Sequence, residues 1–213
     1  MTDKNTLYPI FLKTYQLNTV IVGGGEIGYE KVSFMLKNSP DANITLIAIK
    51  VCEDIWELEK KIPNLKVYER AFKQKDLMGT NLLILATNNI KYDAAVINLA
   101  HRYNILCNAA DKPELCDFYL GSIISRGDLK IAISTNGKSP TLAKRMRQYL
   151  EHALPDNTQE LINNLTNIRN KLKGDFKFKT KLSDDDKAEP GELKVRGFKM
   201  PRSTNFTTLK SGT

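Results

Sequence analysis

Short apolar runs alternate with amphipathic stretches along the first 110 residues of the chain. Each run is rich in aliphatic and β-branched residues and is bounded by polar residues, glycine or proline, which is typical of a buried strand. The expected strands cover 18–23, 43–49, 65–70, 81–88 and 104–109, and the expected helices between them cover 26–37, 54–61 and 92–103. Buried strands separated by helices pair in parallel, with helices on both faces. The alternation therefore predicts an α/β fold with a doubly wound parallel sheet.

Three glycines follow the first expected strand in the pattern G-x-G-x-x-G. Gly23 permits a tight turn, Gly25 lets the backbone approach a pyrophosphate, and Gly28 lets the helix pack closely on the strand. The phosphates would lie against amide groups at the helix N-terminus. Because the motif follows a strand and opens a helix, it favours dinucleotide binding in a Rossmann-like sheet over a purely structural turn.

The choice between NAD and NADP stays open at this level. An acidic residue about 20 positions after the glycines usually binds the ribose 2′-hydroxyl. Ile49 and Lys50 stand in that region, and the nearest acids, Glu53 and Asp54, come a few residues late. A basic Lys50 could instead favour the 2′-phosphate of NADP.

Asp111 comes directly after the fifth expected strand. Ligands of such sheets bind at the carboxyl ends of the strands, so this carboxylate could serve as a general base beside a nicotinamide. A loop aspartate that only caps a turn is the alternative. His101 and His152 lie on expected helices without metal-ligand spacing, and we predict no metal site from them.

The rhythm changes after residue 112. Two strands joined at "SRGD" precede a helix that begins with Ser139 as N-cap and Pro140 as first residue, and another amphipathic helix follows over 158–173. An isolated hairpin is not stable alone, so this small α+β element is expected to mediate dimerisation. "GKS" at 137–139 is no P-loop, because Ala132 stands where that motif needs glycine. It leaves a cationic helix start that suits an anion, with a solvated helix face as the alternative.

The net charge of +8 lies mostly near the C-terminus. Residues 171–213 hold 11 Lys and Arg against 6 Asp and Glu, which is +5 of the total and leaves +3 for the rest. Few large apolar residues occur there, so we expect a flexible basic tail, with a nucleic-acid or membrane-surface arm as the alternative. The sequence has no bilayer-spanning apolar run, no signal-like start and no CxxC among three cysteines. We therefore expect a cytoplasmic protein without disulfides, bound to neither nucleic acid nor membrane.

Six segments occur in a recognisable order: "YPIFLK", "VIVGGGEIGYEKV", "ATNN", "CNAAD", "DFYLGSII" and "LKIAISTNGKSPTLAKRMRQYLE". Together they cover about residues 7–155 and resemble the precorrin-2 dehydrogenase and sirohydrochlorin ferrochelatase family, the N-terminal domain of sirohaem synthase. The N-x-x-D and AIST-x-GKSP patterns are more specific than the glycine motif. The sequence shows no counterpart of the methyltransferase domain that some relatives carry, so the resemblance is to the stand-alone form.

The resemblance implies a homodimer that oxidises precorrin-2 to sirohydrochlorin with NAD as hydride acceptor. It implies that Asp111, the Asp of N-x-x-D, is the catalytic base. Some family members also insert Fe²⁺ into sirohydrochlorin with the same residue, and nothing in the sequence decides whether this chain does so. A non-catalytic module that binds NAD(H) or a tetrapyrrole is the alternative function.

The resemblance also implies the ligand contacts and the organisation of the chain. The nucleotide contacts would be Gly23, Gly25, Glu26, Ile27, Gly28, Ile49, Lys50, Thr87 and Asn88. The tetrapyrrole contacts would be Asn108, Ser134, Thr135, Lys138 and Ser139. The expected parts are an NAD-binding domain over 1–113, a dimerisation and tetrapyrrole-binding segment over 114–150, a helical segment over 151–182 and the tail over 183–213.

Overall fold

The computed structural model describes residues 4–171. The expected basic tail over 183–213 lies outside the described residues, as does the end of the expected helical segment. The strands are β1 (Asn18–Gly24), β2 (Asn43–Val51), β3 (Leu65–Glu69), β4 (Leu82–Leu85), β5 (Leu106–Ala109), β6 (Ser122–Arg126) and β7 (Leu129–Ile133). The α-helices are α1 (Glu26–Asn38), α2 (Glu53–Glu59), α3 (Ile90–His101), α4 (Pro140–Ala153) and α5 (Thr158–Lys171). Three short 3₁₀ turns, η1 (Thr14–Gln16), η2 (Gln74–Leu77) and η3 (Pro113–Leu115), complete the described elements.

The first five strands form one sheet in the order β3-β2-β1-β4-β5, and every neighbouring pair is parallel. The chain winds outward from β1 in one direction through β2 and β3, then crosses back to β4 and β5. The predicted doubly wound α/β sheet is therefore confirmed. The order reverses between β1 and β4, the place where such sheets bind ligands beyond the carboxyl ends of their strands.

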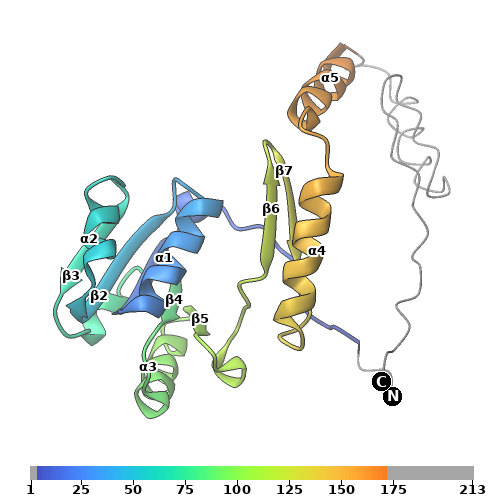
Figure 1. Cartoon of the computed structure of the whole chain (residues 1–213). Coiled ribbons are helices and arrows are strands. Elements are labelled where there is room, and N and C mark those ends of the chain that lie inside the picture. Colours follow the sequence, from blue (N-terminus) through green and yellow to red (C-terminus); the bar gives the residue numbers. More distant parts are fainter. Residues whose placement is uncertain (1–3, 172–213) are drawn as a thin grey trace. The chain divides into compact units, whose positions relative to one another are not determined.

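Helices lie on both faces of this sheet (Figure 1), and each face has its own apolar layer. Ile21 and Leu46 pack with residues of α1 and α2 on one face. Val20 and Leu83 pack with residues of α3 on the other. Because side chains alternate across a strand, strands buried on both faces must be apolar at nearly every position. This requirement produced the continuous apolar runs seen in the sequence.

The chain beyond β5 is simpler. β6 and β7 form a separate two-stranded sheet, joined by Gly127 and Asp128. Helix α4 begins at Pro140, and the Ser139 hydroxyl accepts a hydrogen bond from the Leu142 amide at 3.2 Å, which confirms the predicted N-cap.

The described residues divide into two compact units. One contains the residues up to Ser125 together with Ile131–Arg147, and the other contains Arg126–Lys130 and the residues from Gln148 on. The sheet of five strands and the site described below belong to the first unit. Among the described helices, none is long and apolar enough to cross a membrane.

Candidate active site

The glycine loop lies between β1 and α1. Gly25 is the N-cap of α1, and a Cβ built on it would meet no atom within 4 Å. The Tyr29 amide donates to the Gly25 carbonyl at 2.9 Å, so the helix begins directly at the loop. The amides of Glu26, Ile27 and Gly28 belong to the first turn, whose N–H groups have no acceptor within a helix. An open space at a helix N-terminus fits a pyrophosphate.

The carboxyl end of β2 forms the next part of this edge. Ile49 is 80% exposed there, and Lys50 is exposed beside it. Sequence reasoning found no acidic partner at this point, but the fold brings one from β3. Glu69, the last residue of β3, accepts a hydrogen bond from the Val51 amide through Oε2 at 3.2 Å. A carboxylate therefore stands at the end of β2 although β2 does not supply it.

Thr87 and Asn88 follow β4 at the same edge of the sheet. Thr87 belongs to an internal network: its hydroxyl donates to Asp93 Oδ1 at 2.5 Å, and its carbonyl accepts from Lys112 Nζ at 2.9 Å. Asn89 caps α3 by accepting from the Tyr92 amide at 3.1 Å. The loop between β4 and α3 is thus held from several directions.

Asp111 lies just past the end of β5, in the left-handed region with φ of +59°. This conformation costs an ordinary residue about 1–2 kcal/mol, and aspartate is among the residues that tolerate it best. The flanking backbone is anchored, because the Ala110 amide donates to the Leu85 carbonyl at 2.9 Å and the Lys112 amide to the Ala109 carbonyl at 3.3 Å. The exposed Asp111 side chain is therefore presented by a turn whose neighbours are tied to the sheet.

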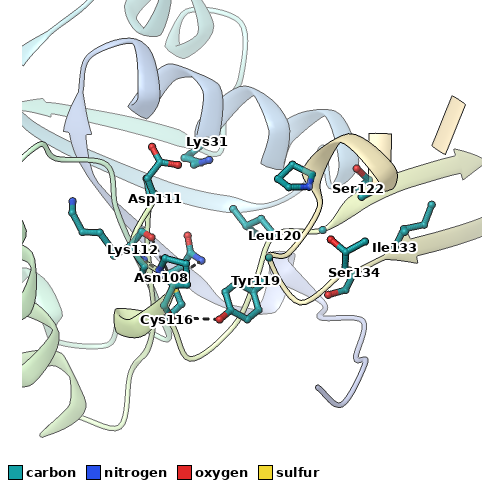
Figure 2. A pocket seen from close by; sticks show the side chains of 18 residues that line it. Lys31, Asn108, Asp111, Lys112, Cys116, Tyr119, Leu120, Ser122, Ile133 and Ser134 are labelled. Atoms are coloured by element: carbon teal, nitrogen blue, oxygen red, sulfur yellow. Dashed lines mark hydrogen bonds between the residues drawn. The ribbon is translucent and has the colours of Figure 1, made fainter. Parts of the chain in front are cut away.

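Asp111 lines a cavity of about 330 Å³ within the first unit (Figure 2). Of the expected substrate residues, Asn108, Ser134 and Thr135 line the same cavity. Lys138 and Ser139 are not among the lining residues, although their neighbours Gly137 and Pro140 are. Ser139 uses its hydroxyl to cap α4 and donates its amide to Thr135 Oγ1 at 3.1 Å. The structure thus gathers the aspartate and the Ser-Thr segment around one cavity.

Lys31 is a lining residue that sequence reasoning missed. It comes from α1, its side chain is 19% exposed, and it lines the same cavity as Asp111 (Figure 2). Lys31 also pairs with Glu30 at 3.1 Å. Lys31 reaches the cavity from α1, far in the sequence from the other lining residues at 108–143, so no local pattern could have indicated it.

Asn108 and Cys116 hold the floor of the cavity together. The Asn108 amide nitrogen donates to the Phe118 carbonyl at 2.8 Å and to Cys116 Sγ at 3.4 Å. The thiol sulfur lies 3.3 Å from both the Ala109 and the Lys112 carbonyl oxygens, which share its single proton. Burial raises the pKa of the Cys116 thiol. Cys116 is therefore a protonated thiol that links neighbouring segments through hydrogen bonds. The Asn108 amide nitrogen is likewise used in hydrogen bonds within the protein.

His101, Cys107 and Asp117 bring one metal-ligating atom each within 4.8 Å of one another. The Asp117 oxygen is already occupied, since Oδ2 lies 2.9 Å from His101 Nε2 and accepts from the Cys107 amide at 2.8 Å. Burial raises the pKa of Cys107 to about 12, so its thiol stays protonated. These three residues therefore connect the edge strand β5 to its neighbours through hydrogen bonds. Neither His101 nor His152 lines the cavity.

Two known family models match the chain. A family model described as NAD(P)-binding matches residues 10–122, and one described as sirohaem biosynthesis protein, central, matches residues 126–153. The chain belongs to this NAD(P)-binding family. The predicted resemblance to the N-terminal domain of sirohaem synthase is confirmed, and the NAD(P)-binding model ends close to the start of β6.

Relatives of this NAD(P)-binding family carry the name siroheme synthase. The protein of Vesicomyosocius okutanii is 38% identical over 170 residues, which cover 79% of this chain and 35% of the relative. The protein of Ruthia magnifica is 35% identical over 168 residues, with the same shares. The chain thus spans about a third of the length of the curated relatives it matches. The solved structure of SirC, a precorrin-2 dehydrogenase, is 28% identical with a TM-score of 0.61, over 76% of this chain and 79% of that one.

Proposed function

We propose that this chain is a precorrin-2 dehydrogenase that uses NAD as hydride acceptor and forms sirohydrochlorin. The observation that carries the proposal is the single cavity shared by Asp111, Asn108 and the Ser134–Thr135 segment. The cavity is lined by residues at the carboxyl end of β5, and the glycine loop that opens α1 lies at the same edge of the parallel sheet. The likeness to SirC over most of both chains supports the same activity.

Oxidation of precorrin-2 to sirohydrochlorin removes one hydride and one proton from the macrocycle. The glycine loop at the start of α1 would hold NAD⁺, which would supply the hydride acceptor. Asp111 accepts the proton through its carboxylate, a role that its place on the cavity wall allows. Lys31 supplies a cation on the same wall for one of the eight substrate carboxylates, and the amides at the start of α4 offer further donors.

The preference for NAD over NADP is part of the proposal. Glu69 places a carboxylate on the Val51 amide at the end of β2, where a dinucleotide fold holds the adenosine ribose. A carboxylate accepts a hydrogen bond from a 2′-hydroxyl and repels a 2′-phosphate. Exposed Ile49 offers an apolar surface for the adenine ring at the same edge.

A homodimer is also part of the proposal, with the 114–150 segment as its interface. Leu142, Met146 and Tyr149 recur at helical spacing on α4, and all three are exposed in the single chain. An exposed apolar stripe of this kind is typical of an interface. Light scattering after gel filtration tests the dimer directly, and a monomer at micromolar concentration contradicts it.

The decisive experiment compares the wild-type chain with Asp111→Asn. Asparagine tolerates positive φ, so this substitution removes the base while keeping the turn. We expect wild-type protein to form NADH and sirohydrochlorin from precorrin-2 and NAD⁺. The variant should lose at least about a hundredfold in kcat, the usual contribution of a general base, while NAD⁺ binding is retained. Unchanged turnover in the variant would show that Asp111 is not the general base.

The same assay separates the remaining alternatives. A chain that binds NAD⁺ and sirohydrochlorin but never reduces the nucleotide is a non-catalytic module. Fe²⁺ added after the oxidation is complete tests iron insertion, because sirohaem and sirohydrochlorin have different absorption spectra. Sirohaem formation no faster than in protein-free solution marks the chain as a dehydrogenase only.

A further inference from the structure

Two lysines line the cavity together with Asp111, and they have different partners. Both lysines line the cavity (Figure 2), but the Lys112 ammonium group is bound to the buried Asp93 carboxylate, whereas Lys31 pairs with the exposed Glu30. The Lys112 side chain is only 14% exposed and lies 2.6 Å from Asp93 Oδ2. Asp93 itself, in the first turn of α3, is wholly buried. Lys112 therefore cannot bind the substrate in the way proposed for Lys31, because its ammonium group is buried against Asp93. The role of this buried pair needs a separate explanation.

Each member of the buried pair has a second hydrogen-bond partner. Asp93 accepts from Lys112 at one oxygen and from the Thr87 hydroxyl at the other, at 2.6 and 2.5 Å. Lys112 donates a second bond to the Thr87 carbonyl at 2.9 Å. A buried ion pair supported by further hydrogen bonds is rigid, and removing one partner leaves the other charge buried without its counter-charge.

This network joins the two halves of the site. Lys112 follows Asp111 directly, so fixing its side chain restricts the turn that presents the Asp111 carboxylate. Thr87 belongs to the loop after β4, on the nucleotide side of the sheet edge. One ammonium group thus ties the base-bearing turn to the loop between β4 and α3.

We propose that Lys112 and Asp93 are positioning residues that hold the Asp111 turn in register with the Thr87 loop. The proposal rests on the proposed dehydrogenase function. Neither residue touches the reacting atoms in this role, and their effect passes through the backbone of Asp111. Removing the pair should leave the glycine loop, and hence the expected pyrophosphate contacts, in place.

The test uses Lys112→Met, Asp93→Asn and the double variant, with Lys60→Met as the matched control. Lys60 also forms an ion pair, with Glu57 at 2.5 Å, but both side chains are largely exposed. We expect kcat for NADH formation to fall about tenfold or more in each single variant, with NAD⁺ affinity changed by less than about threefold. Lys60→Met should match the wild type in both quantities.

The double variant separates positioning from stability. Replacing a buried ion pair by neutral side chains of similar size is often tolerated, so its thermal midpoint should recover toward that of the wild type. Its kcat should stay low, because the tie between the two loops is gone. A double variant that recovers both stability and kcat would show a purely structural pair and overturn the proposal, as would an unchanged kcat in Lys112→Met.

Amide hydrogen exchange on the protein without ligands provides a readout that needs no substrate. Lys112→Met should speed exchange at the Lys112 and Asn89 amides by about tenfold, because both lie in the turns that the network ties down. Unchanged exchange at both amides refutes the positioning role. Absence of NADH with the wild-type chain refutes only the dehydrogenase function, so the two failures are distinguishable.

Discussion

Gly28 faces the carbonyl oxygen of Gly23 so closely that a Cβ on Gly28 would overlap that oxygen and its carbon. The contact joins the first turn of α1 to the end of β1, the two elements that form the expected pyrophosphate site. Gly23 itself has φ of +124°, which a side chain would strain. Gly23 and Gly28 are therefore both required for the close contact between β1 and α1.

Gly28→Ala is expected to weaken both the fold and the nucleotide site. The added methyl group must push α1 away from β1, and overpacking of this kind costs about 1–3 kcal/mol of unfolding free energy. Displacing the helix start should also lower NAD⁺ affinity. Urea unfolding and calorimetric titration measure the two effects, and unchanged values in both would contradict the close contact.

Gly25→Ala should separate the two effects. Gly25 has φ of −87° and open space around its Cβ position, so alanine fits the fold without strain. Loss of a glycine N-cap should cost no more than about 1 kcal/mol. The methyl group would occupy space needed by the pyrophosphate, so NAD⁺ affinity should fall about tenfold or more. Wild-type affinity in this variant would place the phosphates elsewhere.

The sheet could be predicted from the sequence because its strands are buried on both faces, which demands continuous apolar runs. Element ends were harder to place. The strand expected over 81–88 ends at Leu85, because Thr87 turns into the network with Asp93 and Lys112. Helix α3 begins at Ile90, earlier than the expected residue 92, because Asn89 caps it.

The site could be predicted only where a motif marks it. Motifs marked Asp111 and the Ser134–Thr135 segment, and these residues line one cavity, while their catalytic and binding roles stay predictions. Lys31 and Glu69 could not be found, because each reaches the site from an element whose own pattern gives no sign of it. Their places depend on how α1 and β3 pack beside strand ends that are distant in the sequence.

Asp76→Asn should destabilise the protein in a pH-dependent way. Asp76, whose side chain is 8% exposed, accepts two hydrogen bonds from the Arg70 guanidinium, each at 2.8 Å. These bonds hold the pKa of the Asp76 carboxyl below its ordinary value of 3.8. A lowered folded-state pKa gives stability that is complete above the unfolded value and is lost as the pH falls through the folded value.

We therefore expect Asp76→Asn to lower the unfolding free energy by about 1–3 kcal/mol at pH 7, with the difference from wild type shrinking below pH 3.8. Urea unfolding at neutral and acid pH measures it. Glu57→Gln is the matched control, because its pair with Lys60 is exposed and screened by solvent. A difference that stays constant with pH would argue against the charge as its source.

Glu69→Gln should reduce the preference for NAD over NADP. The amide keeps an oxygen that can accept from the Val51 amide, but it no longer repels a 2′-phosphate. We expect the ratio of NAD⁺ to NADP⁺ affinity to fall about tenfold, which corresponds to 1.4 kcal/mol.

Glu59→Gln is the matched control, because Glu59 accepts from the Val67 amide at 2.8 Å through the same kind of bond but projects from α2. Titration of each variant with both nucleotides gives the ratio without requiring turnover. If Glu69→Gln and Glu59→Gln both keep the wild-type ratio, the ribose is read by other groups, and exposed Lys50 becomes the residue to vary next.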